Sequence, residues 1–323
     1  MKLFALALAA SASLLTAQVS GVSHASPRLG FVPGATPSEL QPILGLPGAT
    51  RLGDPISLPF PAKLYLAPGH QYALAEQADG AIAMISLRSA NQTEPALTAI
   101  PGALQNPEII AFSPSGHAAI LYSQSSNRLQ VWNGLPTAPQ LVQNISMVSL
   151  SDVHQAAVSD DAQIVLVGDE SGNVDRVSDT PAVPLYHAAH IASLGFGPGT
   201  HNAIIVDSGS NSVAIVDSAT GRFEALPSPP NRCEPDEAAA TADGRTVLVA
   251  CPAQRLVWSV NRDSGAINVT KIPVSPLQMD RLAARDTFLF SPPDEHGSYW
   301  MVSIHPDGLS LSFVGAHVSG AGQ

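Results

Sequence analysis

The chain has 323 residues, of which 45% are hydrophobic, 13% are charged and only 5% are aromatic, and its formal net charge is −11. This acidity argues against a nucleic-acid phosphate backbone or an anionic membrane surface as a partner, because like charges repel. With 28 prolines and few charges, the composition favours a compact, loop-rich β protein over a helical one.

The N-terminus has the features of a secretory signal peptide. One lysine precedes an apolar run from Leu3 to about Thr16, and small residues lead to Ala25. This run is shorter than the roughly 18–20 apolar residues that span a bilayer, and no later run approaches that length. We therefore predict cleavage after Ala25 and one domain over residues 26–323, exported to the periplasm or the extracellular space. A retained N-terminal anchor is the alternative.

A repeat of hairpins fills the rest of the chain. An apolar residue enters the second strand of a hairpin at Ile82, Leu129, Val174, Val213, Leu256 and Trp300. The spacings are 47, 45, 39, 43 and 44 residues. A period near 44 residues with four strand-like runs in each unit is typical of β-propeller blades.

The repeat predicts an all-β propeller of about seven four-stranded antiparallel blades, with six as the alternative. The six units span about 60–100, 106–146, 152–185, 190–227, 235–274 and 278–315. Before them, Leu29–Val32 and Leu40–Leu44 look like the third and fourth strands of a blade without the first two. This hairpin either adds an incomplete seventh blade or pairs with the last unit to close the ring.

The unit at residues 196–222 carries a resemblance to a known repeat. Its segment AIIVDSGSNSVAIVDSATGR resembles a YVTN-type propeller repeat, and Ile109–Trp132, with FSPSG and LQVW, is similar to WD-type repeats. The resemblance implies a propeller. It leaves the activity open, because this fold hosts binding proteins, scaffolds, lactonases and redox subunits.

The two cysteines, Cys233 and Cys251, predict one structural disulfide, since an exported chain with an even cysteine count permits a bridge. They lie 18 residues apart, and neither sits in the CxxCH pattern of a haem attachment. No cofactor is evident from a motif: the sequence has no GxSxG elbow, no HExxH and no glycine-rich phosphate loop before a helix.

Propeller topology places the A–B and C–D turns on one face and the B–C and D–A connections on the other, around the mouth of the central channel. Side chains at the start of an A strand can point toward this mouth and meet there. The polar residues in these connections are Asn106, Glu108, Asp152, His154, His187, His190, Arg232, Glu234, Asp236, Glu237, Asp280 and Arg281. Our candidates for ligand binding are Glu108, His154, His190 and Asp236, with Arg232 suited to a carboxylate or phosphate. A structural ring of polar groups lining a water-filled channel is the alternative.

Other histidines and carboxylates are expected to be structural. His70, His117 and His201 follow the A–B turns and are interpreted as exposed turn residues. His187 and His190 have the spacing of a metal pair on a helix, but Pro184 and the strand-like residues 191–196 place them in a loop. Residues 169–175 superficially resemble a calcium loop and are expected to form a B–C turn.

We expect an exported propeller that binds a protein or an extracellular small molecule through its D–A and B–C loops. Two rivals stay open. One is a lactonase-like hydrolase with a metal or a histidine and carboxylate set at the channel mouth. The other is a subunit of a periplasmic redox complex, in which a partner carries the cofactor.

Overall fold

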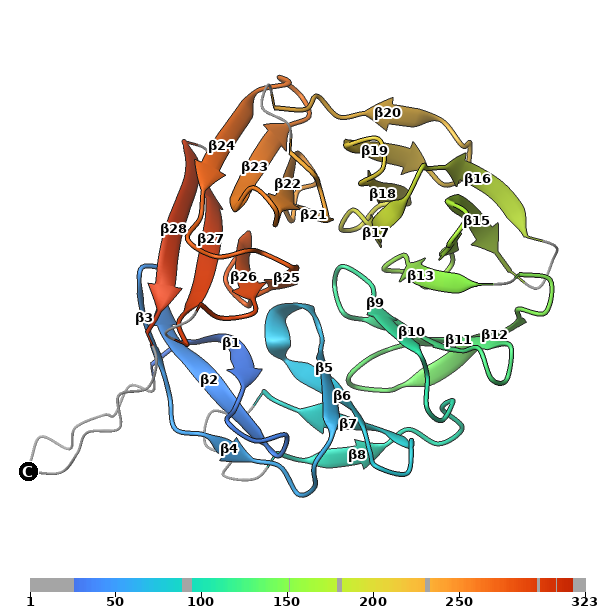
Figure 1. The fold of residues 1–323 in the computed structure, drawn as a ribbon. Coiled ribbons are helices and arrows are strands. Elements are labelled where there is room, and N and C mark those ends of the chain that lie inside the picture. Colours follow the sequence, from blue (N-terminus) through green and yellow to red (C-terminus); the bar gives the residue numbers. More distant parts are fainter. Residues whose placement is uncertain are drawn as a thin grey trace, which may run out of the picture.

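The structure, a computed structural model, describes residues 26–88, 95–150, 152–178, 182–229, 233–294, 297–305 and 307–315. The predicted signal peptide lies outside these residues. The chain forms seven four-stranded antiparallel sheets arranged as blades around a central axis (Figure 1). The prediction of a seven-bladed all-β propeller is confirmed, and the six-bladed alternative is wrong.

Six blades follow the predicted order, with strands A to D running from the axis outward. Blade 2 holds β5 (Lys63–Leu66), β6 (Tyr72–Glu76), β7 (Ile82–Ser86) and β8 (Leu97–Ala99), with the short helix η1 (Pro68–His70) between β5 and β6. Blade 3 holds β9 (Ile109–Phe112), β10 (Ala118–Ser123), β11 (Arg128–Asn133) and β12 (Gln140–Ser146). Blade 4 holds β13 (Val153–Val158), β14 (Val165–Asp169), β15 (Asn173–Val177) and β16 (Val183–His187).

The remaining three blades of this type complete the ring to the C-terminal side. Blade 5 holds β17 (Ile191–Phe196), β18 (Asn202–Asp207), β19 (Ser212–Asp217) and β20 (Phe223–Ala225). Blade 6 holds β21 (Glu237–Ala240), β22 (Thr246–Cys251), β23 (Leu256–Asn261) and β24 (Ile267–Lys271). Blade 7 holds β25 (Gln278–Arg281), β26 (Thr287–Ser291), β27 (Tyr299–His305) and β28 (Gly308–Val314).

The hairpin of β18 and β19 shows why the valine and isoleucine runs form blades. Successive side chains of a strand point to opposite faces of its sheet. On one face, Ile204 and Val206 pack in the cluster shared with blade 6. On the other, Ala203 and Ile205 pack in the cluster shared with blade 4. Because both faces are buried, the strands carry near-continuous apolar runs instead of alternating apolar and polar residues.

Blade 1 is formed entirely by the N-terminal segment. Its strands are β1 (Arg28–Pro33), β2 (Glu39–Leu46), β3 (Ala49–Leu52) and β4 (Ile56–Ser57). Both β3 and β4 pair with β2, so together they form one interrupted outer strand. The four strands of this sheet therefore occupy only three positions between the axis and the rim.

The direction of β1 corrects the predicted role of this hairpin. Leu29 and Phe31 bond to Ala283 and His70, which both lie in A–B turns of the neighbouring blades. The turn after β1 lies at the opposite face. Its Pro37 carbonyl accepts the N–H of Ala62, which lies in the connection that leads into blade 2. β1 thus runs opposite to the other inner strands, in the sense of a B strand. The hairpin is B–C and not C–D, and no described residue forms an A strand in blade 1.

The ring closes by contact between complete sheets. Thr50 Oγ1 donates to the carbonyl of Phe313 at 3.1 Å, and Arg51 forms a parallel bridge with Gly315. An apolar cluster of both blades joins them, including Leu29 of blade 1 and Met301 of blade 7, both buried. The alternative in which the N-terminal hairpin pairs into the last unit is therefore wrong.

Cys233 and Cys251 form the predicted disulfide, with their Cα atoms 5.7 Å apart. The bridge ties the connection before β21 to the end of β22, and both cysteines are buried. A disulfide is typical of proteins in oxidising compartments. In the part of the chain that the structure describes, no helix is long and apolar enough to cross a membrane.

Candidate functional site

A group of acidic residues lies on the A strands of blades 6 and 7, whose first residues are on the D–A side of the ring. Glu237 is the first residue of β21, and its Oε2 accepts the backbone N–H of Met279 in β25 at 2.5 Å. Asp280 follows in β25, and its Oδ1 accepts the side-chain amide of Gln278 at 2.9 Å. Asp236 precedes Glu237 and is half-buried. Two neighbouring blades thus contribute three carboxyl groups to one region.

These carboxyl groups hold their protons unusually tightly. Burial raises the pKa of Glu237 to about 8, with a further contribution from the negative charge of Asp280. Burial also raises the pKa of Asp280 to about 6, and it raises the pKa of Asp236, against the opposing effect of His190. At neutral pH the Glu237 carboxyl is therefore largely protonated, and the site holds less negative charge than its composition implies.

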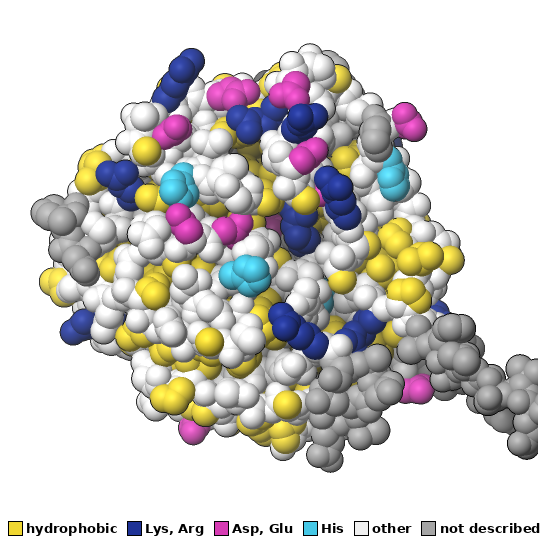
Figure 2. Space-filling view, turned by 180° about the vertical axis from the view of Figure 1, so that it is seen from behind, with side chains coloured by type: hydrophobic (Ala, Val, Ile, Leu, Met, Phe, Trp, Pro, Cys, Tyr) yellow, Lys and Arg dark blue, Asp and Glu magenta, His cyan; other side chains and the backbone are white. Residues whose placement is uncertain are grey.

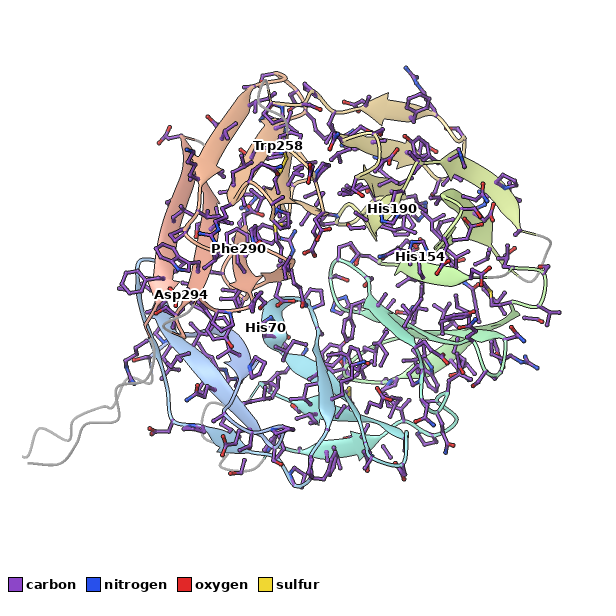
Figure 3. The ribbon with its side chains drawn as sticks, in the orientation of Figure 1. His70, His154, His190, Trp258, Phe290 and Asp294 are labelled. Carbon is purple, nitrogen blue, oxygen red and sulfur yellow. A yellow bond between two sulfur atoms is a disulfide. The ribbon has the colours of Figure 1, made fainter. Side chains whose placement is uncertain are left out.

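The two candidate histidines come from neighbouring blades but have different surroundings (Figure 3). His154, in β13, bonds through Nε2 to the carbonyl of Ile191 at 3.3 Å, and its buried Nδ1 has no hydrogen-bond partner among the described residues. His190 precedes β17 and is exposed, and its charge acts on Asp236. His190 therefore acts on Asp236 electrostatically, whereas His154 joins the inner strands of blades 4 and 5.

Glu108 lies apart from this group. It is exposed, and its Oε2 accepts the backbone N–H of Gln124 at 2.8 Å, so it caps the B–C turn of its own blade. It also lines an open cavity of about 490 Å³ between the first three blades, together with Lys63 and Glu76. Arg232, the remaining candidate, lies outside the described residues.

The loop residues expected to be structural behave as turns. Asp169 Oδ1 accepts the N–H of Asn173 at 2.8 Å, which closes a B–C turn. His187 bonds to the same turn, with its Nδ1 3.1 Å from Asn173 Oδ1, whereas His190 acts on Asp236 of the next blade. Among the described residues, no group of three or more His, Cys, Asp or Glu side chains is placed to hold a metal ion.

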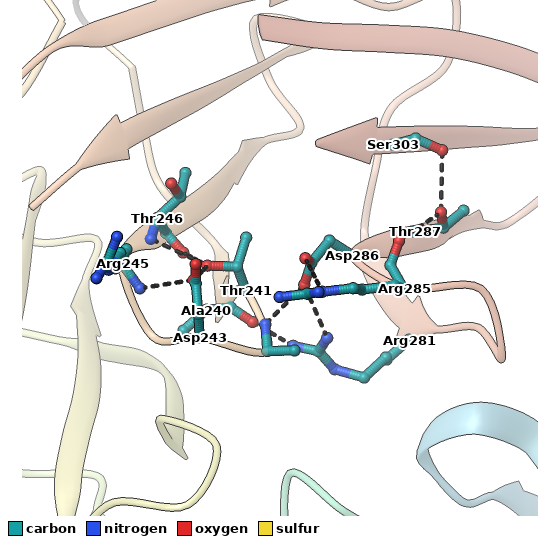
Figure 4. Close-up of polar contacts among 11 residues, drawn as sticks. Ala240, Thr241, Asp243, Arg245, Thr246, Arg281, Arg285, Asp286, Thr287 and Ser303 are labelled. Carbon is teal, nitrogen blue, oxygen red and sulfur yellow. Dashed lines mark hydrogen bonds and ion pairs between the residues drawn. The ribbon is translucent and has the colours of Figure 1, made fainter. Parts of the chain in front are cut away.

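Arg281, at the end of β25, is held between blades 6 and 7 (Figure 4). Its guanidinium donates to the carbonyl of Ala240 and lies 3.7 Å from Asp286 Oδ1. The same Asp286 oxygen accepts the N–H of Ala242 at 2.6 Å. Burial lowers the pKa of Arg281, against the opposing effects of the Asp286 and Asp160 carboxylates. Arg281 therefore fixes the positions of two blades.

The opposite face of the ring carries the A–B turns, and one prediction about it is wrong. His117 and His201 are exposed, and His201 pairs with Asp161 at 2.8 Å. His70, by contrast, is only 3% exposed. It is buried because it occupies the inner side of blade 1, where the A strand is missing. Figure 2 shows the ring from behind Figure 1, with charged and histidine side chains around the middle of that face.

Glu237 and Asp280 were included among the connection residues, but the sequence did not single them out as binding residues. What distinguishes them is that they lie on adjacent A strands, where Glu237 bonds to the backbone of Met279 and burial together with the charge of Asp280 raises the pKa of Glu237. The sequence offered only a weak signal for them, the adjacent acidic residues Asp236 and Glu237 at the start of an A strand. Chemically, the group can exchange protons or bind a cation.

No protein family matches the chain, and no curated protein matches it. Solved structures define its class as a seven-bladed propeller. One is a functionally unknown protein from Desulfotomaculum acetoxidans, with 14% identity and a TM-score of 0.60, covering 90% of this chain and 100% of that chain. Another is apo AztD from Citrobacter koseri, with 12% identity and a TM-score of 0.58, covering 90% and 95%. At these identities the likeness shows the fold alone.

Proposed function

We propose that this chain is an exported binding protein that recognises a cationic amine, free or on a partner segment, at the D–A mouth of the channel. The carboxyl pair Glu237 and Asp280 carries the proposal. The pKa values of about 8 and about 6 mean that the folded protein disfavours two negative charges there. A bound cation would stabilise both ionised carboxylates. It would thereby offset the free energy that it costs to ionise them in the folded protein.

An organic ammonium group suits this region better than a metal ion. The described residues offer no set of three metal ligands, whereas an alkylammonium has three donors and needs only acceptors around it. Asp236, half-buried beside the pair, supplies a third carboxyl group. The net charge of −11 would also attract a cationic ligand over a distance.

The proposed export implies that the chain meets its ligand outside the cytoplasm. The disulfide of Cys233 and Cys251 is typical of an oxidising compartment, and it lies in the blade that carries Glu237. The surrounding D–A and B–C loops would supply further contacts to a protein segment, while a polyamine would need only the carboxyl groups.

The test is calorimetric titration of the purified chain with spermidine. Glu237→Gln and Asp280→Asn each remove a carboxylate without changing side-chain size, and each is expected to weaken binding about tenfold or more. The matched control is Glu234→Gln, which removes the same charge from an exposed position three residues away and should bind within about twofold of the unaltered chain. Equal affinity for all four proteins would contradict the proposal.

A hydrolase is the second candidate, and the same carboxyl pair favours it. Strongly shifted pKa values in a channel are typical of acid and base catalysts, and Asp280, with a pKa of about 6, is suited to activate water at neutral pH. The test is acid release from δ-valerolactone in a pH-stat. Hydrolysis that Asp280→Asn abolishes would support the enzyme, and a rate equal to the protein-free blank would contradict it.

A further inference from the structure

The missing A strand of blade 1 leaves a gap that neighbouring blades only partly fill. On the inner edge of β1, the carbonyl of Leu29 accepts the N–H of Ala283 at 2.8 Å, and the N–H of Phe31 donates to His70 Nδ1 at 2.9 Å. Gly30 lies between them, and a Cβ there would stand 2.7 Å from His70 Nδ1. These contacts satisfy the strand edge, yet they replace a full strand with two turns.

A cavity of about 420 Å³ opens beside this gap, on the face of the A–B turns. Its described lining residues are Ser26, Pro27, Arg28, Gly30, Gly69, His70, Gln71, Leu87, Arg88 and Ala283. Two of these, Arg28 and Arg88, are arginines, His70 is neutral at pH 7 because burial lowers its pKa to about 4, and no described lining residue is acidic. Such a concentration of basic groups is unusual for a chain with a net charge of −11.

The polar side chains of the cavity present hydrogen-bond donors. The Arg28 guanidinium stacks on the Phe31 ring at 4.8 Å and donates to the carbonyl of Leu87, which fixes its plane. Arg88 Nε donates to Gln71 Oε1 at 3.1 Å, so the Gln71 amide presents its NH₂ group. His70 accepts through Nδ1, so in its neutral form the proton is on Nε2.

We propose that this cavity binds a small oxyanion, a carboxylate or a phosphate, through Arg28 and Arg88. Planar guanidinium groups match the geometry of both anions and can bond to them in a bidentate manner. The volume lies within the roughly 300–1,000 Å³ range of small-molecule sites. The site is on the opposite face from the acidic channel mouth, and it does not depend on the function proposed above.

The experiment is calorimetric titration of the full chain, at low ionic strength, with inorganic phosphate and separately with citrate. At least one anion is expected to bind, and its identity distinguishes a phosphate site from a carboxylate site. Arg88→Gln should weaken that binding about tenfold or more, while Arg222→Gln, the same charge change at an exposed distant position, should leave it unchanged.

A second pair of variants keeps the test independent of folding. Ala283 is exposed at the cavity rim, so both Ala283→Glu and Ala283→Gln can be accommodated. The added carboxylate should abolish anion binding, while the glutamine of matched size should retain it within a few-fold. The proposal is overturned if neither anion binds at millimolar concentration, or if Arg88→Gln and Ala283→Glu both bind as the unaltered chain does.

Discussion

The carboxylate of Asp160 accepts the backbone N–H of Ser115 at 2.7 Å, although the two residues lie in the A–B turns of different blades. Its other oxygen accepts the N–H of Gly199, in the turn of the next blade, at 2.8 Å. One side chain thus joins the turns of blades 3, 4 and 5. Although burial acts to raise it, hydrogen bonds including those from Ser115 and Gly199 hold the pKa of Asp160 below its usual value.

We expect Asp160→Asn to destabilise the fold, because the asparagine amide places a donor against one of the two N–H groups. The expected loss is between about 1 and 3 kcal/mol in the free energy of unfolding. Urea denaturation at pH 7 measures it. The control is Asp263→Asn, since its exposed pair with Arg245 is 3.7 Å long and contributes about 0–1 kcal/mol. Equal losses from both substitutions would refute the inter-blade role of Asp160.

His70 is expected to make the fold sensitive to acid. Burial lowers its pKa from 6.5 to about 4, so the folded state binds fewer protons there than the unfolded state. Stability from this group is complete above pH 6.5 and is lost as the pH falls toward 4. His70→Asn keeps an acceptor and suits the positive φ of 51°, so its unfolding free energy should change less over this range. If the unfolding free energies of both proteins changed with pH in parallel, His70 would not be the source of the acid sensitivity.

The disulfide is expected to contribute substantially to stability. Cys233 and Cys251 enclose a separation of 18 residues, for which constraint of the unfolded chain amounts to about 3 kcal/mol. The double variant Cys233→Ala, Cys251→Ala should lose about that much free energy of unfolding, measured by urea denaturation. Thiol labelling of the unfolded, unreduced protein provides the direct check: two reactive thiols would show that the bridge does not form.

Glu237 is expected to give the opposite pH dependence to His70. Its pKa is raised from 4.5 to about 8, so the folded state binds the additional proton. This stabilisation is present below pH 4.5 and is lost as the pH rises toward 8. Relative to the unaltered chain, Glu237→Gln should therefore gain unfolding free energy between pH 4.5 and pH 8. The gain is at most about 5 kcal/mol, because one pKa unit corresponds to about 1.4 kcal/mol. The exposed Glu234→Gln should show no such gain, and a gain of equal size there would exclude a local cause.

The repeat pattern was sufficient to predict the blades, because each blade buries both faces and its strands therefore carry apolar runs of fixed spacing. The first blade shows the limit of this reasoning. A hairpin such as Leu29–Val32 with Leu40–Leu44 would show the same pattern of apolar residues as an A–B, a B–C or a C–D pair of a blade. Only its neighbours, Ala283 and His70, determine that it is a B–C pair. The burial of His70 follows from this position, and for that reason no local pattern could predict it.

The candidate site was predictable as a region and not as a set of residues. The D–A connections were predicted to bring polar residues of several blades together, and in the structure Glu237 of blade 6 bonds to the backbone of Met279 in blade 7. Which residues meet depends on the rotation between adjacent blades, which the sequence does not encode in any short motif. Burial raises the pKa of Asp236, and the charge of His190 in the preceding blade opposes this rise, whereas Glu108 caps a turn and His154 joins two inner strands.

The most direct test of the proposed function is the number of protons released when spermidine binds. Titration at pH 7 in two buffers of different ionisation enthalpy gives this number. Because the pKa of Glu237 is about 8, its carboxyl is largely protonated at pH 7, and a cation that stabilises the carboxylate must release the proton. We predict release of about one proton per bound spermidine in the unaltered chain and close to none in Glu237→Gln. Binding without proton release, or with the same release in both proteins, would contradict recognition of a cation by this carboxyl pair.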